Sequence, residues 1–154
     1  MSSTNAYLIA ATLFGSGLLA GVLFGVAVGV VPAFSAVSAE RYIALHRVVG
    51  AGFDQVMPKI VFATTVFDVI AGIRIGGTAG ALLFTAAALQ VGVAVVSQLG
   101  NVPINKAVRA LPEEGLLPAD WSDPRARWRR LHLLRTTFAI AALAAHAVVL
   151  VTVV

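Results

Sequence analysis

The sequence predicts an all-α integral membrane protein in which four transmembrane helices form a bundle. Hydrophobic residues make up 59% of its 154 residues and charged residues only 12%, against about 45–50% and about 25% in soluble domains. A mean hydropathy of +0.93 exceeds what a soluble domain of this size can bury in one core. The apolar residues fall into four stretches of about 20 residues, the length that crosses a bilayer. No internal repeat is visible, so we expect one domain over residues 1–154.

The predicted spans cover about residues 7–31, 56–73, 78–99 and 133–154. The first contains no charged residue, and Pro32 should end it because proline disrupts a helix interior. It has no Lys or Arg before it and is too long for a cleaved signal peptide. Gly76 and Gly77 form a short turn between the second and third spans, which makes these two helices antiparallel neighbours.

The two long connections, residues 32–55 and 100–136, are rich in cations and predict the orientation. They hold Arg41, Arg47, Lys106, Arg109, Arg125, Arg127, Arg129, Arg130 and Arg135. The opposite side of the bundle holds Arg74 alone. Because Lys and Arg favour the cytoplasmic side, we expect cytoplasmic connections and both termini outside. This topology, together with contact between basic residues and lipid, accounts for the positive net charge, so we expect no nucleic-acid partner. Lys is scarce whereas Ala, Val and Arg are abundant, which suggests a bacterial protein in the plasma membrane.

Each long connection is expected to contain an amphipathic helical segment. Residues 40–47 suffice for a short interfacial helix before the second span. Before the fourth span, Ser122 or Asp123 is placed to cap a helix that has Pro124 in its first turn. This second helix would continue unbroken into the membrane.

Three glycines of the first span, Gly21, Gly25 and Gly29, repeat every four residues and share one face. Small residues allow helices to approach closely within a membrane. We therefore expect this face to pack against a neighbouring helix. The neighbour could also belong to a second copy of the chain, so a homo-oligomer is a further expectation.

Amide side chains gather where the third span leaves the membrane. Gln98, Asn101 and Asn105 would share one face if the helix continues. Pro103 instead favours a kink or an end near Val102, which would expose backbone carbonyls. The two asparagines therefore either cap a broken helix or contact a substrate or cofactor.

An indole, an imidazole and a guanidinium meet at the start of the fourth span. Trp128, His132 and Arg135 project from one side of the predicted helix. Trp128 alone is typical of the aromatic belt at the membrane surface. His132 and Arg135 lie beyond the basic cluster, in apolar surroundings where ionisable groups usually have a partner or a function.

His46 lies on the same side of the membrane as His132, so these two imidazoles are candidate metal ligands. Copper, zinc or iron would be chemically suitable, but no ligand motif accompanies the pair. The chain has no cysteine, which excludes disulfides, thiolate metal sites and Cys nucleophiles.

Two further ionisable residues, Asp68 and His146, lie inside apolar spans toward the outer side. The simpler interpretation is that they hydrogen-bond each other within the bundle, with Arg74 near Asp68. A proton path is the alternative, although two groups do not form a continuous chain across the bundle.

Two short motifs indicate a family. Asn-Val-Pro-Ile-Asn, residues 101–105, ends the third span, and Trp-x-x-x-His-x-x-Arg-Thr, residues 128–136, opens the fourth. Together with the four spans they resemble the anthrone oxygenase-like membrane proteins over essentially the whole chain. Family members tend to have Trp-Asn-His before the Arg-Thr pair, so His132 stands at the family's Asn position.

The resemblance implies a membrane oxygenase that uses O2 to convert an anthrone to an anthraquinone in aromatic polyketide biosynthesis. By this resemblance His132 would remove a proton from the substrate, and Arg135 would stabilise the resulting oxyanion with the amides of Asn101 and Asn105. Trp128, Gln98 and His46 would bind a small, flat, apolar aromatic molecule at the cytoplasmic face.

Two alternatives to this cofactor-free oxygenase remain open. One is a metal-dependent redox enzyme with copper or iron at His46 and His132. The other is a non-enzymatic carrier, or a subunit that stabilises a partner protein in the bilayer.

Overall fold

A computed structural model describes residues 2–112, 118 and 121–153. Within these residues the all-α prediction is confirmed, and four helices are long and apolar enough to cross a membrane. The elements are α1 (Ser3–Gly25), the π-helix η1 (Val26–Val30), α2 (Val31–Ala36), α3 (Ala39–Ile75), α4 (Gly77–Val96), the π-helix η2 (Ser97–Asn101), α5 (Val102–Arg109) and α6 (Arg125–Val153). Residue 154, the predicted end of the fourth span, lies outside the described residues.

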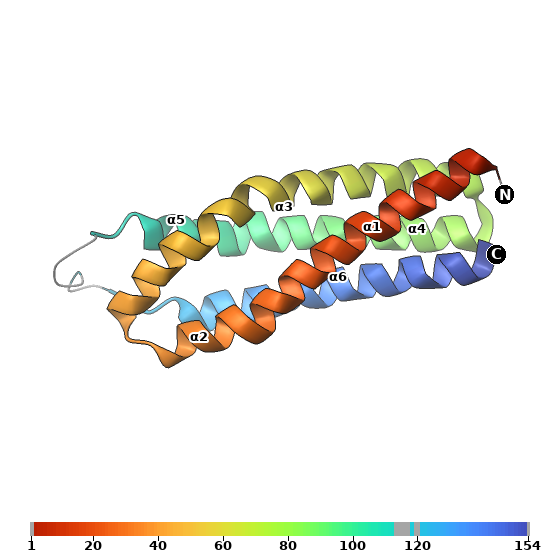
Figure 1. The fold of residues 1–154 in the computed structure, drawn as a ribbon. Coiled ribbons are helices and arrows are strands. Elements are labelled where there is room, and N and C mark those ends of the chain that lie inside the picture. Colours follow the sequence, from red (N-terminus) through yellow and green to blue (C-terminus); the bar gives the residue numbers. More distant parts are fainter. Residues whose placement is uncertain (1, 113–117, 119–120, 154) are drawn as a thin grey trace.

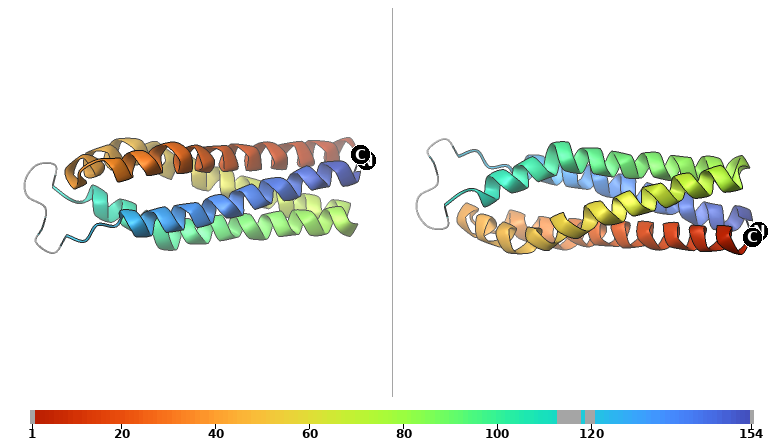
Figure 2. Two further views of the ribbon diagram at one scale, coloured as in Figure 1. Left: turned by 90° about the horizontal axis from the view of Figure 1, so that it is seen from below. Right: turned by 90° about the horizontal axis from the view of Figure 1, so that it is seen from above.

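The helices form a bundle with two distinct ends (Figure 1). Both termini and the turn at Gly76 lie at one end, here called the terminal end, while α2, α5 and the start of α6 lie at the other, the loop end. Around the bundle, α1 and α4 each pack against both α3 and α6. From the terminal end to the loop end, α3 runs away from α4 and toward α1 and α2 (Figure 2).

Pro32 does not end the first helix, so this expectation is wrong. The backbone N–H of Val31 bonds to the carbonyl of Val26, five residues back, and that of Val102 bonds to Ser97 in the same way. Proline has no N–H, and its ring would clash with the carbonyl four residues earlier in a regular α-helix. The wider π turn before each proline relieves this clash, so the helices continue through Pro32 and Pro103.

The two π turns belong to a short internal repeat that the sequence analysis overlooked. The pattern Gly-x-Val-Pro-x-x-x-Ala-Val occurs at residues 29–37 and again at 100–108. A second pattern, Arg-aromatic-x-x-Leu-His, occurs at 41–46 on α3 and at 127–132 on α6. The chain therefore consists of two hairpins with parallel orientation, as in membrane proteins whose repeats are related by an axis along the membrane normal.

The two predicted amphipathic segments are helical, and each joins the span that follows it, as expected for the second but not for the first. Residues 40–47 form the first turns of α3 itself, which continues through Pro58 into the span. In α6, the backbone N–H of Trp128 donates to the carbonyl of Pro124 at 2.9 Å. The Asp123 carboxylate accepts the backbone N–H of Arg125 at 2.9 Å, so the predicted helix start lies within one or two residues of the observed start at Arg125.

Close helix contact depends on glycines other than the predicted stripe. A Cβ on Gly80 would lie 2.7 Å from the carbonyl oxygen of Gly72, so α3 and α4 touch through their backbones near the terminal end. Among the described residues, nothing outside the local backbone of the first helix lies within 4 Å of the Cβ positions of Gly21, Gly25 and Gly29. This stripe faces away from the described bundle, and its role in self-association stays a prediction.

Candidate functional site

A cavity of about 370 Å³ lies among the helices in the loop half of the bundle, within the range of small-molecule pockets, about 300–1,000 Å³. Most of its lining is apolar and comes from α1, α3, α4 and α6. The polar residues in the lining are His46, Asp54, Thr65, Ser97, Gln98, Asn105, Trp128 and Arg135. A few polar groups in an apolar pocket are typical of a ligand site.

Asn105 of α5 fixes the orientation of His46. The Trp128 indole, which can only donate, gives its Nε1–H to the Oδ1 of Asn105 at 2.8 Å. The same oxygen lies 3.1 Å from Nε2 of His46, and Nδ2 of Asn105 donates to the Asp54 carboxylate at 3.4 Å. Because an amide oxygen can only accept, Nε2 of His46 must carry the proton in this bond.

The other ring nitrogen of His46 is therefore an unprotonated acceptor in the neutral imidazole. This Nδ1 is buried and has no hydrogen-bond partner among the described residues, and the residue lines the cavity. Burial lowers the pKa of His46, and the charge of Arg109 acts in the same direction, against the hydrogen bond to Asn105. His46 thus offers a neutral imidazole with a free lone pair beside an apolar pocket.

His132 is held differently, because both of its ring nitrogens have partners. Nε2 lies 3.0 Å from the backbone carbonyl of Leu23, and Nδ1 accepts from Nε and Nη2 of Arg135 at 3.2 and 2.9 Å. The imidazole stacks on the indole of Trp128, with ring centroids 5.2 Å apart and planes 7° from parallel. It lies behind the cavity wall and orients Arg135 and Trp128.

Arg135 brings a positive charge to the wall of the cavity. Its Nη1 donates to the Ser97 hydroxyl at 3.2 Å. No carboxylate lies within ion-pair distance of this guanidinium in the part of the chain that the structure describes. A desolvated guanidinium with unused N–H groups is suited to bind an oxyanion.

Of the other two predicted site residues, Gln98 lines the cavity and Asn101 does not. Gln98 lines the cavity from an exposed position. Asn101 is fully buried behind the wall, and its Nδ2 donates to the backbone carbonyl of Trp128 at 3.1 Å. It joins η2 to α6 and does not cap a broken helix.

Two side chains that position the site, Arg109 and Phe34, were not predicted from the sequence. Arg109 pairs with Asp54 at 2.5 Å, and this carboxylate in turn holds Asn105. The ring of Phe34 lies 5.4 Å from that of His46 and 5.7 Å from that of Trp128. The repeat is the signal that could have found Phe34, since it aligns this residue with Asn105.

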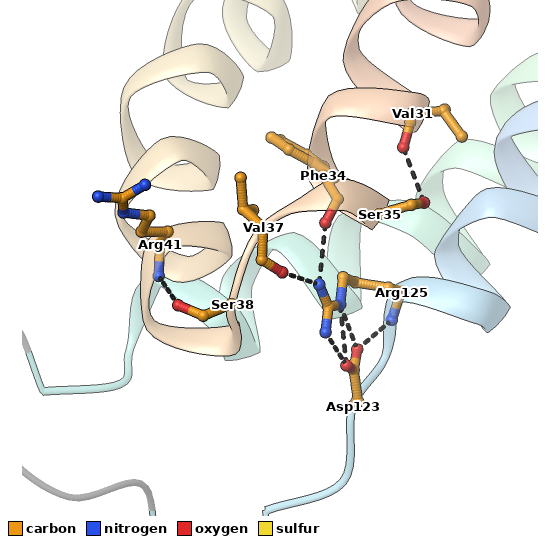
Figure 3. Close-up of polar contacts among 8 residues, drawn as sticks. All are labelled: Val31, Phe34, Ser35, Val37, Ser38, Arg41, Asp123 and Arg125. Atoms are coloured by element: carbon orange, nitrogen blue, oxygen red, sulfur yellow. Dashed lines mark hydrogen bonds and ion pairs between the residues drawn. The ribbon is translucent and has the colours of Figure 1, made fainter.

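Arg125 fastens the end of α2 to the start of α6 (Figure 3). Its Nη1 donates to the carbonyls of Phe34 and Val37 at 2.9 and 2.8 Å, and Nη2 pairs with Asp123 at 2.6 Å. Carbonyls at the end of a helix attract cations. The contact fixes the backbone of Phe34, and the hydrogen bond from Arg125 holds the pKa of Asp123 below its usual value.

A metal site at His46 and His132 finds no support in this geometry. His132 has no free ring nitrogen to offer. No group of three or more His, Asp or Glu side chains suited to a metal occurs among the described residues.

Asp68 and His146 form a separate cluster toward the terminal end. Nε2 of His146 lies 2.6 Å from Oδ1 of Asp68, and Gln90 donates to Oδ2 at 2.8 Å. The predicted contact between the two residues is confirmed, whereas Arg74 instead donates to Asn5 at 3.1 Å. None of these side chains lines the cavity.

Comparison with known proteins identifies the family. No curated protein and no solved structure matches the chain. The family model described as anthrone oxygenase matches residues 3–145, which include all of α1, α3 and α4, α6 as far as Ala145, and every residue that lines the cavity. The chain therefore belongs to the anthrone oxygenase family.

Proposed function

We propose that this protein is a membrane oxygenase that uses O2 to convert the CH2 group of an anthrone, a flat aromatic ketone, into a second carbonyl. The observation that carries the proposal is the free Nδ1 of His46, which belongs to a neutral imidazole beside an apolar cavity. Family membership supports the reaction class. The indole of Trp128 and the guanidinium of Arg135 in the same wall support an aromatic substrate that becomes anionic.

The chemistry needs a base and a stabilised oxyanion. Nδ1 of His46 takes one proton from the CH2 group, which is acidic because the electron pair spreads into the ketone, and Arg135 binds the enolate oxygen. The electron-rich carbon reduces O2 and forms a new C–O bond. Loss of water then leaves the carbonyl, so one oxygen atom enters the product and the other leaves with two hydrogens.

This assignment gives His46 the role that the sequence analysis expected of His132. The distinction depends on hydrogen bonding, because of these two histidines His46 alone has a ring nitrogen without a hydrogen-bond partner among the described residues. In the proposal His132 positions Arg135, and Asn105 keeps His46 in the productive tautomer. The cation-rich loop end faces the cytoplasm, following the charge rule.

Isotope labelling tests the reaction. Lipid vesicles that contain the protein are incubated with anthrone under ¹⁸O₂, and the quinone is analysed by mass spectrometry beside empty vesicles. We expect faster quinone formation with one ¹⁸O atom per product. Arg135→Leu should lower the rate about 10²–10³-fold, whereas Arg130→Leu, the matched change at an exposed position of α6, should not. Equal rates with and without protein would refute the proposal.

A further inference from the structure

One side wall of the cavity is open to the surroundings of the bundle. The lining residues contributed by α1 and α6 are buried or half-buried. On α3 and α4, by contrast, Phe53 is 39%, Phe62 72% and Val91 49% exposed. Pro58 of α3 and Gln98 of η2, which follows α4, are exposed as well. The cavity therefore has a window between α3 and α4, in the surface that would face lipid.

Side-chain contacts close this window at both ends. At the loop end the Arg109–Asp54 ion pair, 2.5 Å long, joins α5 to α3. Toward the terminal end Gln90 of α4 donates to Asp68 of α3 at 2.8 Å. Toward the loop end α3 diverges from α4 (Figure 2). The two contacts tie α3 to α5 and to α4, so the opening is a bounded feature of the bundle.

The cavity is elongated, and its polar groups are unevenly distributed. His46 and Thr65 both line it from α3, and a helix rise of about 1.5 Å per residue places them roughly 28 Å apart. The His46 end also carries Asp54 and Asn105, whereas the far end is lined mostly by apolar residues such as Leu19, Val61, Phe62 and Val91. Because a volume of about 370 Å³ is spread over this length, the cavity must be narrow. Its apolar far end is here called the apolar arm, and it lies behind the polar site at His46.

From this shape we propose that the cavity takes its ligand sideways from the bilayer through the α3–α4 window. The ligand is an aromatic molecule with an apolar chain: the flat headgroup lies between His46 and Arg135, and the chain follows the apolar arm. Only the headgroup rests on the proposed function. Moving an apolar chain from lipid into an apolar arm changes its solvation free energy little, because both surroundings are apolar. The arm therefore admits the chain, and the polar end selects the headgroup.

The first experiment tests the window without any substrate. In the variant Trp121→Phe, Trp128 is the only tryptophan, and its fluorescence is measured in vesicles whose lipids carry bromine on their acyl chains. We expect chains to enter the arm and quench Trp128, and Val91→Phe to reduce this quenching at least twofold. Val95→Phe is the matched control, because Val95 is on the same helix, is equally exposed at 49%, and does not line the cavity. Equal quenching in both variants would overturn the window.

The second experiment tests the ligand class under anaerobic conditions, so that binding is measured without turnover. Anthrone and an anthrone with a dodecyl chain are titrated into the same vesicles, and affinities are expressed per concentration in the bilayer. We expect both to bind within about threefold of each other in the Trp121→Phe protein and in Val95→Phe. Val91→Phe should weaken the chain-bearing ligand at least tenfold and leave anthrone within threefold.

Each other result has a defined meaning. If the Trp121→Phe protein binds anthrone but not the chain-bearing ligand, the inference is overturned, since the cavity would then be closed toward lipid. If neither anthrone binds, the headgroup assignment falls together with the proposed function, while the bromine quenching still decides the window by itself.

Discussion

Two buried imidazoles at opposite ends of the bundle look alike in their own contacts. His46 has its Nε2 3.1 Å from the amide oxygen of Asn105, and His146 has its Nε2 2.6 Å from the carboxylate of Asp68. In each ring Nδ1 is buried without a hydrogen-bond partner. The difference is that His46 lines a cavity whereas His146 does not. A buried ionisable group thus identifies a site only where its side chain borders a cavity.

The partners of the two rings differ as well. Asn105 is neutral and is itself held by Trp128 and Asp54, which favours one tautomer of His46. Asp68 forms a fully buried pair with His146 and also accepts from Gln90, so this cluster ties α3 to α4 and α6. We therefore assign the loop-end imidazole to chemistry and the terminal-end imidazole to packing.

The largest expected effect separates these two roles directly. His46→Gln should lower the rate of quinone formation about 10²–10⁴-fold, the usual contribution of a general base. His146→Gln should leave the rate within about twofold, because Gln can still donate to Asp68 and lies away from the cavity. Rates are measured in vesicles by the absorbance of the quinone. An equal loss in both variants would end the distinction.

The terminal-end cluster should dominate stability. Asp68→Leu is expected to destabilise the fold by about 3–5 kcal/mol, because it leaves a buried partner unpaired. Asp54→Leu, which breaks a partly exposed pair with Arg109, should cost about 1 kcal/mol or less. Thermal unfolding in detergent compares the two.

A double change tests the physical cause. When Asp68→Leu is combined with His146→Leu, much of the loss should be recovered, because an apolar pair replaces a buried hydrogen-bonded pair at little cost. If the double variant is less stable than Asp68→Leu alone, the cluster contributes through other contacts and the assignment fails.

Helix contact near the terminal end provides a smaller stability effect. Gly80→Ala would place a methyl group against the Gly72 carbonyl, and such overpacking costs about 1–3 kcal/mol. Gly21→Ala meets nothing within the chain and should be neutral or slightly stabilising, since Ala favours helix over Gly. Detergent unfolding again provides the measurement, and a large loss for Gly21→Ala would indicate that the stripe packs against another copy.

Hydropathy alone predicts the four spans because a bilayer demands long apolar segments whatever their neighbours. The continuation of the helices through Pro32 and Pro103 was beyond this reasoning, since a π turn that accommodates proline leaves no compositional mark. The residue set of the site was partly predictable from polar residues near one membrane face. The roles of His46 and His132 were not, because they depend on which partner each nitrogen meets across 59 and 109 residues of chain.

The smallest expected effect is in the pH dependence, and it again concerns one imidazole only. An unshifted histidine with a pKa of 6.5 would lose about half of its neutral form between pH 8 and pH 6.5. Because burial and Arg109 lower the pKa of His46, the rate should change less than about twofold over this range and fall only at lower pH. The neutral ring's contribution to stability is lost in the same direction, as pH falls through the lowered pKa.

Two variants show which imidazole governs this acid limb of the pH–rate profile. Arg109→Gln removes a positive charge that lowers the pKa of His46. It also leaves the Asp54 carboxylate without its ion-pair partner, and the negative charge of Asp54 raises the pKa of His46. The acid limb should therefore move to higher pH. His146→Gln should leave the limb where it is, because His146 lies in the other cluster. Profiles of kcat/KM between pH 5 and pH 8 provide the test. A limb that follows His146 instead of Arg109 would place the base at the terminal end and reverse the comparison between the two imidazoles.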